Sequence, residues 1–286
     1  MEFHTVKETR NDEWVSLALH RYESEHPDPV RVILLHGFTG SAKEWNLLLP
    51  FFDEHVEIIA PDLPGHGMSD KLDDPDFYLT ANQTSMLHQL FQDYTKDKRK
   101  PVFCGYSMGG RLALAYALKY PDTISGLILL SATAGITDQQ ERDIRRDKDR
   151  ELAAFAAGAE IDEFLDLWLA QPVMESLQRL PEALQQMIYQ NRLNNTPTAL
   201  AASLLGFGTG VMPPMWDKLP ELNIPTLLIT GEQDTKFTVI NQEMKELMPN
   251  AAFYVVTNAG HSVHLENPTE VSLIINKYIT TLFKNE

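Results

Sequence analysis

Short runs of consecutive apolar residues recur along the chain, and turn residues bound each of them. Six of these runs are rich in β-branched residues or leucine: Val30–Leu35, Val56–Ala60, Val102–Cys104, Leu127–Ser131, Thr226–Thr230 and Phe253–Val256. Because the apolar residues are consecutive rather than alternating, the pattern predicts strands buried on both faces, as in a parallel sheet that helices cover.

Helical stretches separate these predicted strands. The clearest are Arg111–Lys119 and Val239–Leu247, each of which ends just ahead of a proline. Alternating strands and helices predict an α/β domain with right-handed crossovers. Ahead of them, Phe3–Glu8 and Trp14–Tyr22 predict an antiparallel hairpin that opens the sheet.

The segment from 138 to 220 interrupts this alternation. It begins with a charged stretch, continues with several amphipathic helical stretches and contains no convincing strand, and strands resume only at Thr226. The length of 286 residues would suit roughly two average domains. We instead expect residues 138–220 to form a helical lid inserted into a single core, which comprises residues 1–137 and 221–286.

Composition narrows the class of protein. The chain has 24 Lys+Arg against 40 Asp+Glu, a net charge of −16, and so acidic a surface repels phosphate backbones and anionic lipids. We therefore expect no nucleic-acid partner.

The single cysteine, Cys104, excludes internal disulfides and a cysteine-based structural zinc site. No apolar run approaches the roughly 18 residues that span a bilayer, and no secretory signal is visible, so we expect a cytoplasmic protein without membrane insertion.

The pentapeptide Gly105-Tyr106-Ser107-Met108-Gly109 fits the pattern G-x-S-x-G. It lies between a predicted strand and a predicted helix, which is the context that makes this pattern a nucleophile elbow. Glycines are required there because the turn is tight and strained. We expect Ser107 to stand above the sheet at a helix N-terminus, where the helix dipole favours developing negative charge.

A serine of this kind needs a histidine and a carboxylate, which follow it in the order Asp or Glu, then His. Asp234 comes after the fifth predicted strand and His261 after the sixth. Because the carboxyl ends of parallel strands share one edge of the sheet, we expect Ser107, Asp234 and His261 to meet there as a catalytic triad. Glu232 and His264 are nearby competitors for the last two roles.

An oxyanion hole needs a second backbone N–H besides that of the residue after the nucleophile, here Met108. The loop HGFTG follows the first predicted parallel strand and offers the N–H of Phe38, whereas His36 and His66 are expected to be structural. The sequence contains no P-loop, no G-x-G-x-x-G after the first strand and no His and carboxylate cluster at metal-ligand spacing. Neither a cofactor nor a metal site is implied.

The motifs HGFTG, DLPGHG, GYSMGG, GEQD and AGHSVHLENP occur in the order typical of the α/β-hydrolase superfamily, which the chain resembles over essentially its whole length. This resemblance implies an α/β-hydrolase fold, with a mostly parallel central sheet and an inserted helical lid. The scaffold alone does not fix a reaction. A narrower set, GYSMGGR, ERxxR, NRxNN and GEQDTKF, resembles the 2-succinyl-6-hydroxy-2,4-cyclohexadiene-1-carboxylate (SHCHC) synthases of menaquinone biosynthesis.

The narrower resemblance implies a lyase that eliminates pyruvate from 2-succinyl-5-enolpyruvyl-6-hydroxy-3-cyclohexene-1-carboxylate, a small substrate with three carboxylates. Guanidinium groups suit such an anion because they bind carboxylates through two parallel hydrogen bonds. The substrate-binding positions that the resemblance implies are Arg111, Arg145, Arg192, Tyr106 and Trp168. The choice of Arg145 over Arg146 rests on the motif spacing alone, and Arg192 could instead pair with a nearby acid.

On this hypothesis the triad acts as a base. Asp234 orients His261, His261 draws the proton from Ser107, and Ser107, or His261 through it, then removes the acidic ring proton. Two alternatives stay open. A carboxylesterase or C–C bond hydrolase of the same fold would use the triad for covalent capture of an acyl group, and a non-catalytic receptor on the same scaffold would bind a ligand without turnover. The oligomeric state is left open as well.

Overall fold

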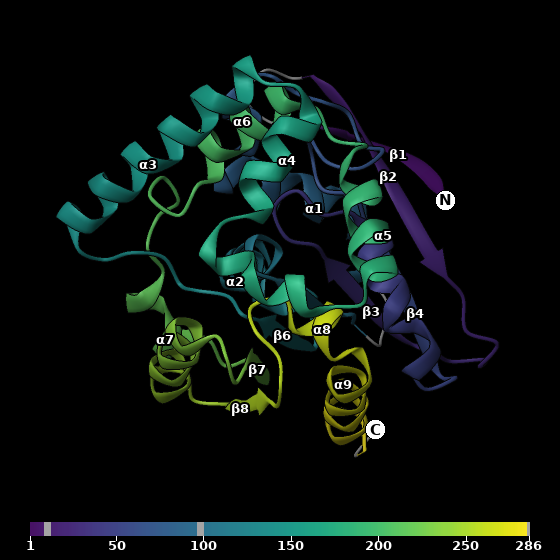
Figure 1. The fold of residues 1–286 in the computed structure, drawn as a ribbon. Coiled ribbons are helices and arrows are strands. Elements are labelled where there is room, and N and C mark those ends of the chain that lie inside the picture. The colour runs from purple at the N-terminus through teal and green to yellow at the C-terminus, as the bar shows by residue number, and fades with distance from the viewer. Residues whose placement is uncertain (9–12, 96–99, 285–286) are drawn as a thin grey trace.

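The computed structural model describes residues 1–8, 13–95 and 100–284, and its centre is an eight-stranded sheet in the order β1-β2-β4-β3-β5-β6-β7-β8 (Figure 1). The strands are β1 (Glu2–Lys7), β2 (Trp14–Tyr22), β3 (Val30–Leu35), β4 (Val56–Pro61), β5 (Val102–Tyr106), β6 (Gly126–Leu130), β7 (Thr226–Gly231) and β8 (Ala251–Val256). The β1-β2 and β2-β4 pairs are antiparallel and all other neighbours are parallel. The predicted fold class and the opening hairpin are confirmed.

Helices cover both faces of the sheet. One face packs against α1 (Thr80–Thr95), α2 (Met108–Lys119) and α7 (Thr235–Leu247); the other packs against α9 (Pro268–Leu282), the short α8 (Val263–Glu266) and the 3-10 helix η1 (Ala42–Leu47). Along β3, Ile33 and Leu35 face the first layer while Val32 and Leu34 face the second. Because both sets are buried, the strand is apolar at consecutive positions.

The last strand differs from the prediction. β8 lies at the edge of the sheet, beside β7, and its side chains Tyr254 and Val255 are 41% and 40% exposed. An edge strand has one neighbouring strand and less cover from the helical layers. The expectation that Phe253–Val256 is buried on both faces is therefore wrong, although the strand itself is present.

Helices occupy the segment between 138 and 220, without a strand. They are α3 (Gln139–Gly158), α4 (Ile161–Leu169), η5 (Pro172–Arg179), α5 (Glu182–Arg192), α6 (Pro197–Phe207) and the greater part of η6 (Trp216–Glu221). The side chain of Asp138 starts this segment by accepting the N–H of Glu141 at 2.8 Å, as a helix N-cap does. In Figure 1, α3, α4 and α6 lie together on the side of the molecule away from α7 and α9. The exact division into core and lid stays a prediction.

The two ends of this helical segment lie side by side. The N–H of Met215 donates to the carbonyl of Ala134 at 2.7 Å, and the indole N–H of Trp216 donates to the carbonyl of Gly135 at 2.8 Å. The chain thus leaves the sheet after β6 and returns ahead of β7 at the same place. Within the described ranges, no helix is both long enough and apolar enough to cross a membrane.

Candidate active site

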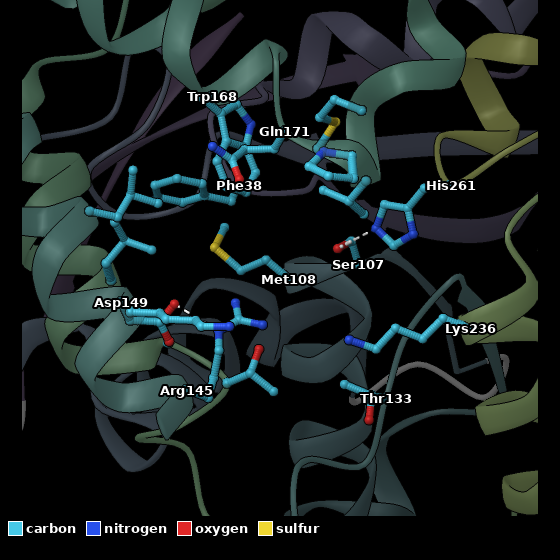
Figure 2. Close-up of a pocket in the computed structure, with 18 of the residues that line it drawn as sticks. Phe38, Ser107, Met108, Thr133, Arg145, Asp149, Trp168, Gln171, Lys236 and His261 are labelled. Carbon is cyan, nitrogen blue, oxygen red and sulfur yellow. Dashed lines mark hydrogen bonds and ion pairs between the residues drawn. The ribbon is translucent and has the colours of Figure 1, made fainter. Parts of the chain in front are cut away.

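Ser107 lies on the sharp turn between β5 and α2. Its backbone has φ +49° and ψ −106°, a conformation that non-glycine residues rarely adopt. A Cβ atom on Gly105 would lie 2.3 Å from the carbonyl oxygen of Gly109, and one on Gly109 would lie 2.1 Å from that of Leu35. The glycines of the pentapeptide are therefore required by space, and the turn directs the Ser107 hydroxyl into a cavity (Figure 2).

The structure brings Ser107, Asp234 and His261 together. Nδ1–H of His261 donates to Oδ2 of Asp234 at 2.7 Å, which leaves Nε2 as an acceptor 3.0 Å from the Ser107 hydroxyl oxygen. Asp234 is itself held in place because its other oxygen caps α7 by accepting the N–H of Phe237. This hydrogen-bonded chain of carboxylate, imidazole and hydroxyl allows the imidazole to accept the serine proton.

The two competitors for these roles lie elsewhere. Glu232 accepts the backbone N–H of Asn258 at 3.1 Å. His264 is fully buried, with its ring centroid 4.3 Å from that of Tyr106 and 4.7 Å from that of Trp45. Neither competitor lines the cavity over Ser107.

The cavity over Ser107 has a volume of about 1120 Å³. Phe38 and Met108, the predicted oxyanion-hole residues, both line it next to Ser107, and Tyr106 and Trp168 line it as well. The Phe38 ring meets the Trp168 ring edge to face, with 5.0 Å between centroids. The cavity therefore gathers the predicted pocket aromatics around the triad, and the oxyanion role of the two backbone amides stays a prediction.

Arg111 projects into this cavity from α2. Its guanidinium donates to the carbonyl of Phe207 at 2.7 Å and lies 4.7 Å from the centroid of the Phe207 ring. Burial, together with the nearby charge of Arg145, lowers the pKa of Arg111 to about 9. Among the described residues no carboxylate bonds to Arg111, so its charge is available to a ligand.

Arg145 lines the same cavity from α3, where it donates to Asp149 at 2.8 Å (Figure 2). Its neighbour Arg146 pairs instead with Asp143 and does not line the cavity. The structure thus brings Arg145, rather than Arg146, to the candidate site.

Arg192 is a correction to the predicted site, because the structure does not bring it to the cavity. It is 1% exposed, and its Nε and Nη2 both donate to one oxygen of Glu44 at 3.1 Å. Burial alone would raise the pKa of Glu44, but the charge of Arg192 and the contact with His264 lower it to about 2. A buried guanidinium needs a compensating charge, and here the protein supplies it.

Lys236 is a cavity residue that the sequence did not single out. It lies two positions after Asp234, and Figure 2 shows its amine directed into the cavity. The motif GEQDTKF contains it, so the resemblance offered a signal, but a lysine at the start of a helix is equally typical of a solvated surface. Thr133 and Gln171 also line the cavity, and the sequence assigned neither of them a role.

The buried side chain of His66 should make the stability of the folded protein depend on pH. It is fully buried with Nδ1 2.9 Å from the carbonyl of Pro64, and burial with the neighbouring His36 lowers its pKa to about 3. The unfolded state binds this proton below about pH 6.5 and the folded state does not. The contribution of neutral His66 to stability is therefore full above pH 6.5, and up to about 4 kcal/mol of it is lost as the pH falls towards 3.

Thermal unfolding between pH 7 and 4 measures this effect. His66→Gln should lower the melting temperature at pH 7 yet make its fall with acidity shallower than in the wild type. His26→Gln, at an exposed loop position, is the control and should keep the wild-type slope. An unchanged slope in His66→Gln would contradict the assignment.

Comparisons with known proteins agree with this architecture. A family model described as alpha/beta hydrolase fold matches residues 30–268. A protein of Bacillus subtilis (strain 168), provisionally named as an SHCHC synthase, is 39% identical over 88% of this chain and 90% of its own length. The SHCHC synthase of Citrobacter koseri is 31% identical over 84% of this chain and 90% of its own length.

Two solved structures are similar throughout. MenH from S. aureus has a TM-score of 0.88 and 32% identity, covering 92% of this chain and 98% of that one. A malate-bound thermophilic esterase from Thermogutta terrifontis has a TM-score of 0.83 and 25% identity, covering 99% of both chains. The chain belongs to the α/β-hydrolase fold family and, within it, to the family of the SHCHC synthases.

Proposed function

We propose that the protein is a carbon–oxygen lyase, which eliminates pyruvate from 2-succinyl-5-enolpyruvyl-6-hydroxy-3-cyclohexene-1-carboxylate to give SHCHC in menaquinone biosynthesis. The observation that carries this proposal is the presence of Arg111 and Arg145 in the cavity of a complete triad. A substrate with three carboxylates needs cations inside its site, and guanidinium groups are the most suitable ones.

Arg111 supports the proposal most directly. A buried cation without a carboxylate partner is costly, because desolvation is only partly offset by a carbonyl and a thioether. A substrate carboxylate would remove that cost on binding. The same feature has no use in a pocket for neutral esters.

The triad then serves as a base. His261, oriented by Asp234, takes the proton of Ser107, and the serine oxygen removes the proton on the ring carbon beside the succinyl ketone. In the alternative, Ser107 keeps its proton and neutral His261 removes the ring proton directly. The electrons of that C–H bond form an enolate, and the backbone amides of Phe38 and Met108, two residues that line the cavity, would stabilise its oxygen. Collapse of the enolate shifts the ring double bond and breaks the bond to the enolpyruvyl oxygen, so that pyruvate leaves and the diene forms.

Carboxylester hydrolysis is the second candidate. The likeness to the Thermogutta terrifontis esterase favours it, since the same triad could form an acyl-enzyme. That reaction needs water at the serine and uses neither of the cavity arginines.

One assay separates the two candidates. The purified protein is given the enolpyruvyl substrate with continuous detection of pyruvate, and in parallel short p-nitrophenyl esters. We expect pyruvate to appear in equal amount to SHCHC, with ester hydrolysis far slower. Rapid ester hydrolysis with no pyruvate released would replace the lyase by the esterase.

A further inference from the structure

Lys236 lines the cavity together with the cationic residues Arg111, Arg145 and Lys148, and the reaction as described does not use it. We propose that Lys236 binds the carboxylate of the enolpyruvyl group and stabilises the pyruvate enolate as it leaves. The inference rests on the proposed function and assigns one end of the substrate to one wall of the site.

The position of Lys236 is tied to the triad. It is the second residue of α7, and Asp234 caps that helix with one oxygen while holding His261 with the other. Figure 2 shows the amine entering the cavity below Ser107, from the wall facing Arg145. The carboxylate that orients the base thus also fixes the helix that carries this ammonium group.

Lys236 is exposed in the first turn of α7, and its amine lies 5.8 Å from the centroid of the Phe237 ring. A cation in the first turn of a helix is disfavoured by the helix dipole, and α7 has no acidic residue in its first turn. No ion pair of Lys236 is present among the described residues. The carboxylate of Asp234 already caps the start of α7, so the ammonium group of Lys236 supplies the positive charge on this wall, and an anion bound there would be stabilised by it.

The connectivity of the substrate decides which carboxylate reaches this wall. The ring carboxylate and the succinyl chain are on neighbouring carbons, so they suit the adjacent side chains Arg111 and Arg145. The enolpyruvyl group is on the carbon across the ring from the one that loses its proton. With the first two groups towards the arginines, the third extends towards Lys236.

Charge moves towards Lys236 during the elimination. When the C–O bond breaks, its electrons stay on the departing oxygen, and the negative charge passes from the succinyl enolate to the pyruvate enolate. The proton held by the triad then completes pyruvate. An ammonium group beside the departing enolate binds this state more tightly than the substrate, so it should raise kcat and not only lower KM.

Three variants test the proposal with the full-length protein. Lys236→Met should lower kcat/KM for pyruvate release about 10- to 100-fold, with a fall in kcat, as the loss of a charge-assisted hydrogen bond implies. Lys236→Arg should keep most of the wild-type kcat/KM, because arginine keeps the positive charge. Lys245→Met is the matched control, because Lys245 is exposed on the same helix and outside the cavity, and its kinetics should equal the wild type.

Binding of pyruvate alone gives a readout that needs no turnover. Saturation-transfer NMR should detect pyruvate on the wild type and on Arg145→Met, and lose it on Lys236→Met. Pyruvate binding that survives in Lys236→Met, or that Arg145→Met abolishes instead, would overturn the assignment. So would a change in KM alone. A wild type that releases no pyruvate would defeat the proposed function, and the binding experiment would still decide whether Lys236 holds this carboxylate.

Discussion

Ser107→Ala is expected to lower kcat for pyruvate release by at least about 10³-fold, because the base then loses the hydroxyl that relays its proton. The variant should fold normally, since removal of one oxygen leaves the turn between β5 and α2 unchanged. The measurement is the rate of pyruvate release at saturating substrate, with circular dichroism as the check on folding.

Ser272→Ala is the matched control for this experiment. Ser272 is buried in α9, bonded to the carbonyl of Leu48 and remote from the cavity, so its loss should leave the rate unchanged. Near-normal release by Ser107→Ala, combined with loss in His261→Ala, would contradict the role of the serine and make the histidine the direct base.

Arg192→Met is expected to lower the free energy of unfolding by about 3–5 kcal/mol, because it leaves the charge of Glu44 buried without its partner. Urea unfolding at pH 7 measures the loss. The double variant Glu44→Gln with Arg192→Met should recover much of it, since neither charge is then left alone. Arg150→Met, at an exposed position on α3, should change stability little.

This expectation separates two roles for Arg192. The family resemblance implied a contact with substrate, whereas the structure places the side chain in a buried ion pair. An Arg192→Met variant with wild-type stability and a raised KM would favour a contact between Arg192 and the substrate and contradict its role in the buried ion pair.

The triad could be located from sequence because each member depends on local pattern alone. Ser107, Asp234 and His261 each follow an apolar run that ends in a turn, and the parallel sheet brings those turns to one edge. The glycines around Ser107 added a second local signal, since only they fit the turn.

The remaining features depend on contacts that no local pattern encodes. Arg192 pairs with Glu44 across 148 positions of the chain, and nothing near either residue indicates the other. The exposure of β8 follows from its place at the edge of the sheet, which is a property of strand order rather than of the strand. Lys236 was visible in a motif, but the direction of its side chain depends on how α7 packs against the sheet.

The paired ends of the helical segment have a consequence for how such enzymes diversify. Ala134 and Gly135 are bonded to Met215 and Trp216, so the segment is closed at its base and the sheet on either side is continuous without it. A longer or shorter segment would cost little, because loop-closure entropy grows slowly with length. Arg145 and Trp168 would change with it while the triad stayed in place. The part of the substrate preference that Arg145 and Trp168 provide can therefore evolve in one stretch of the gene, independently of the triad.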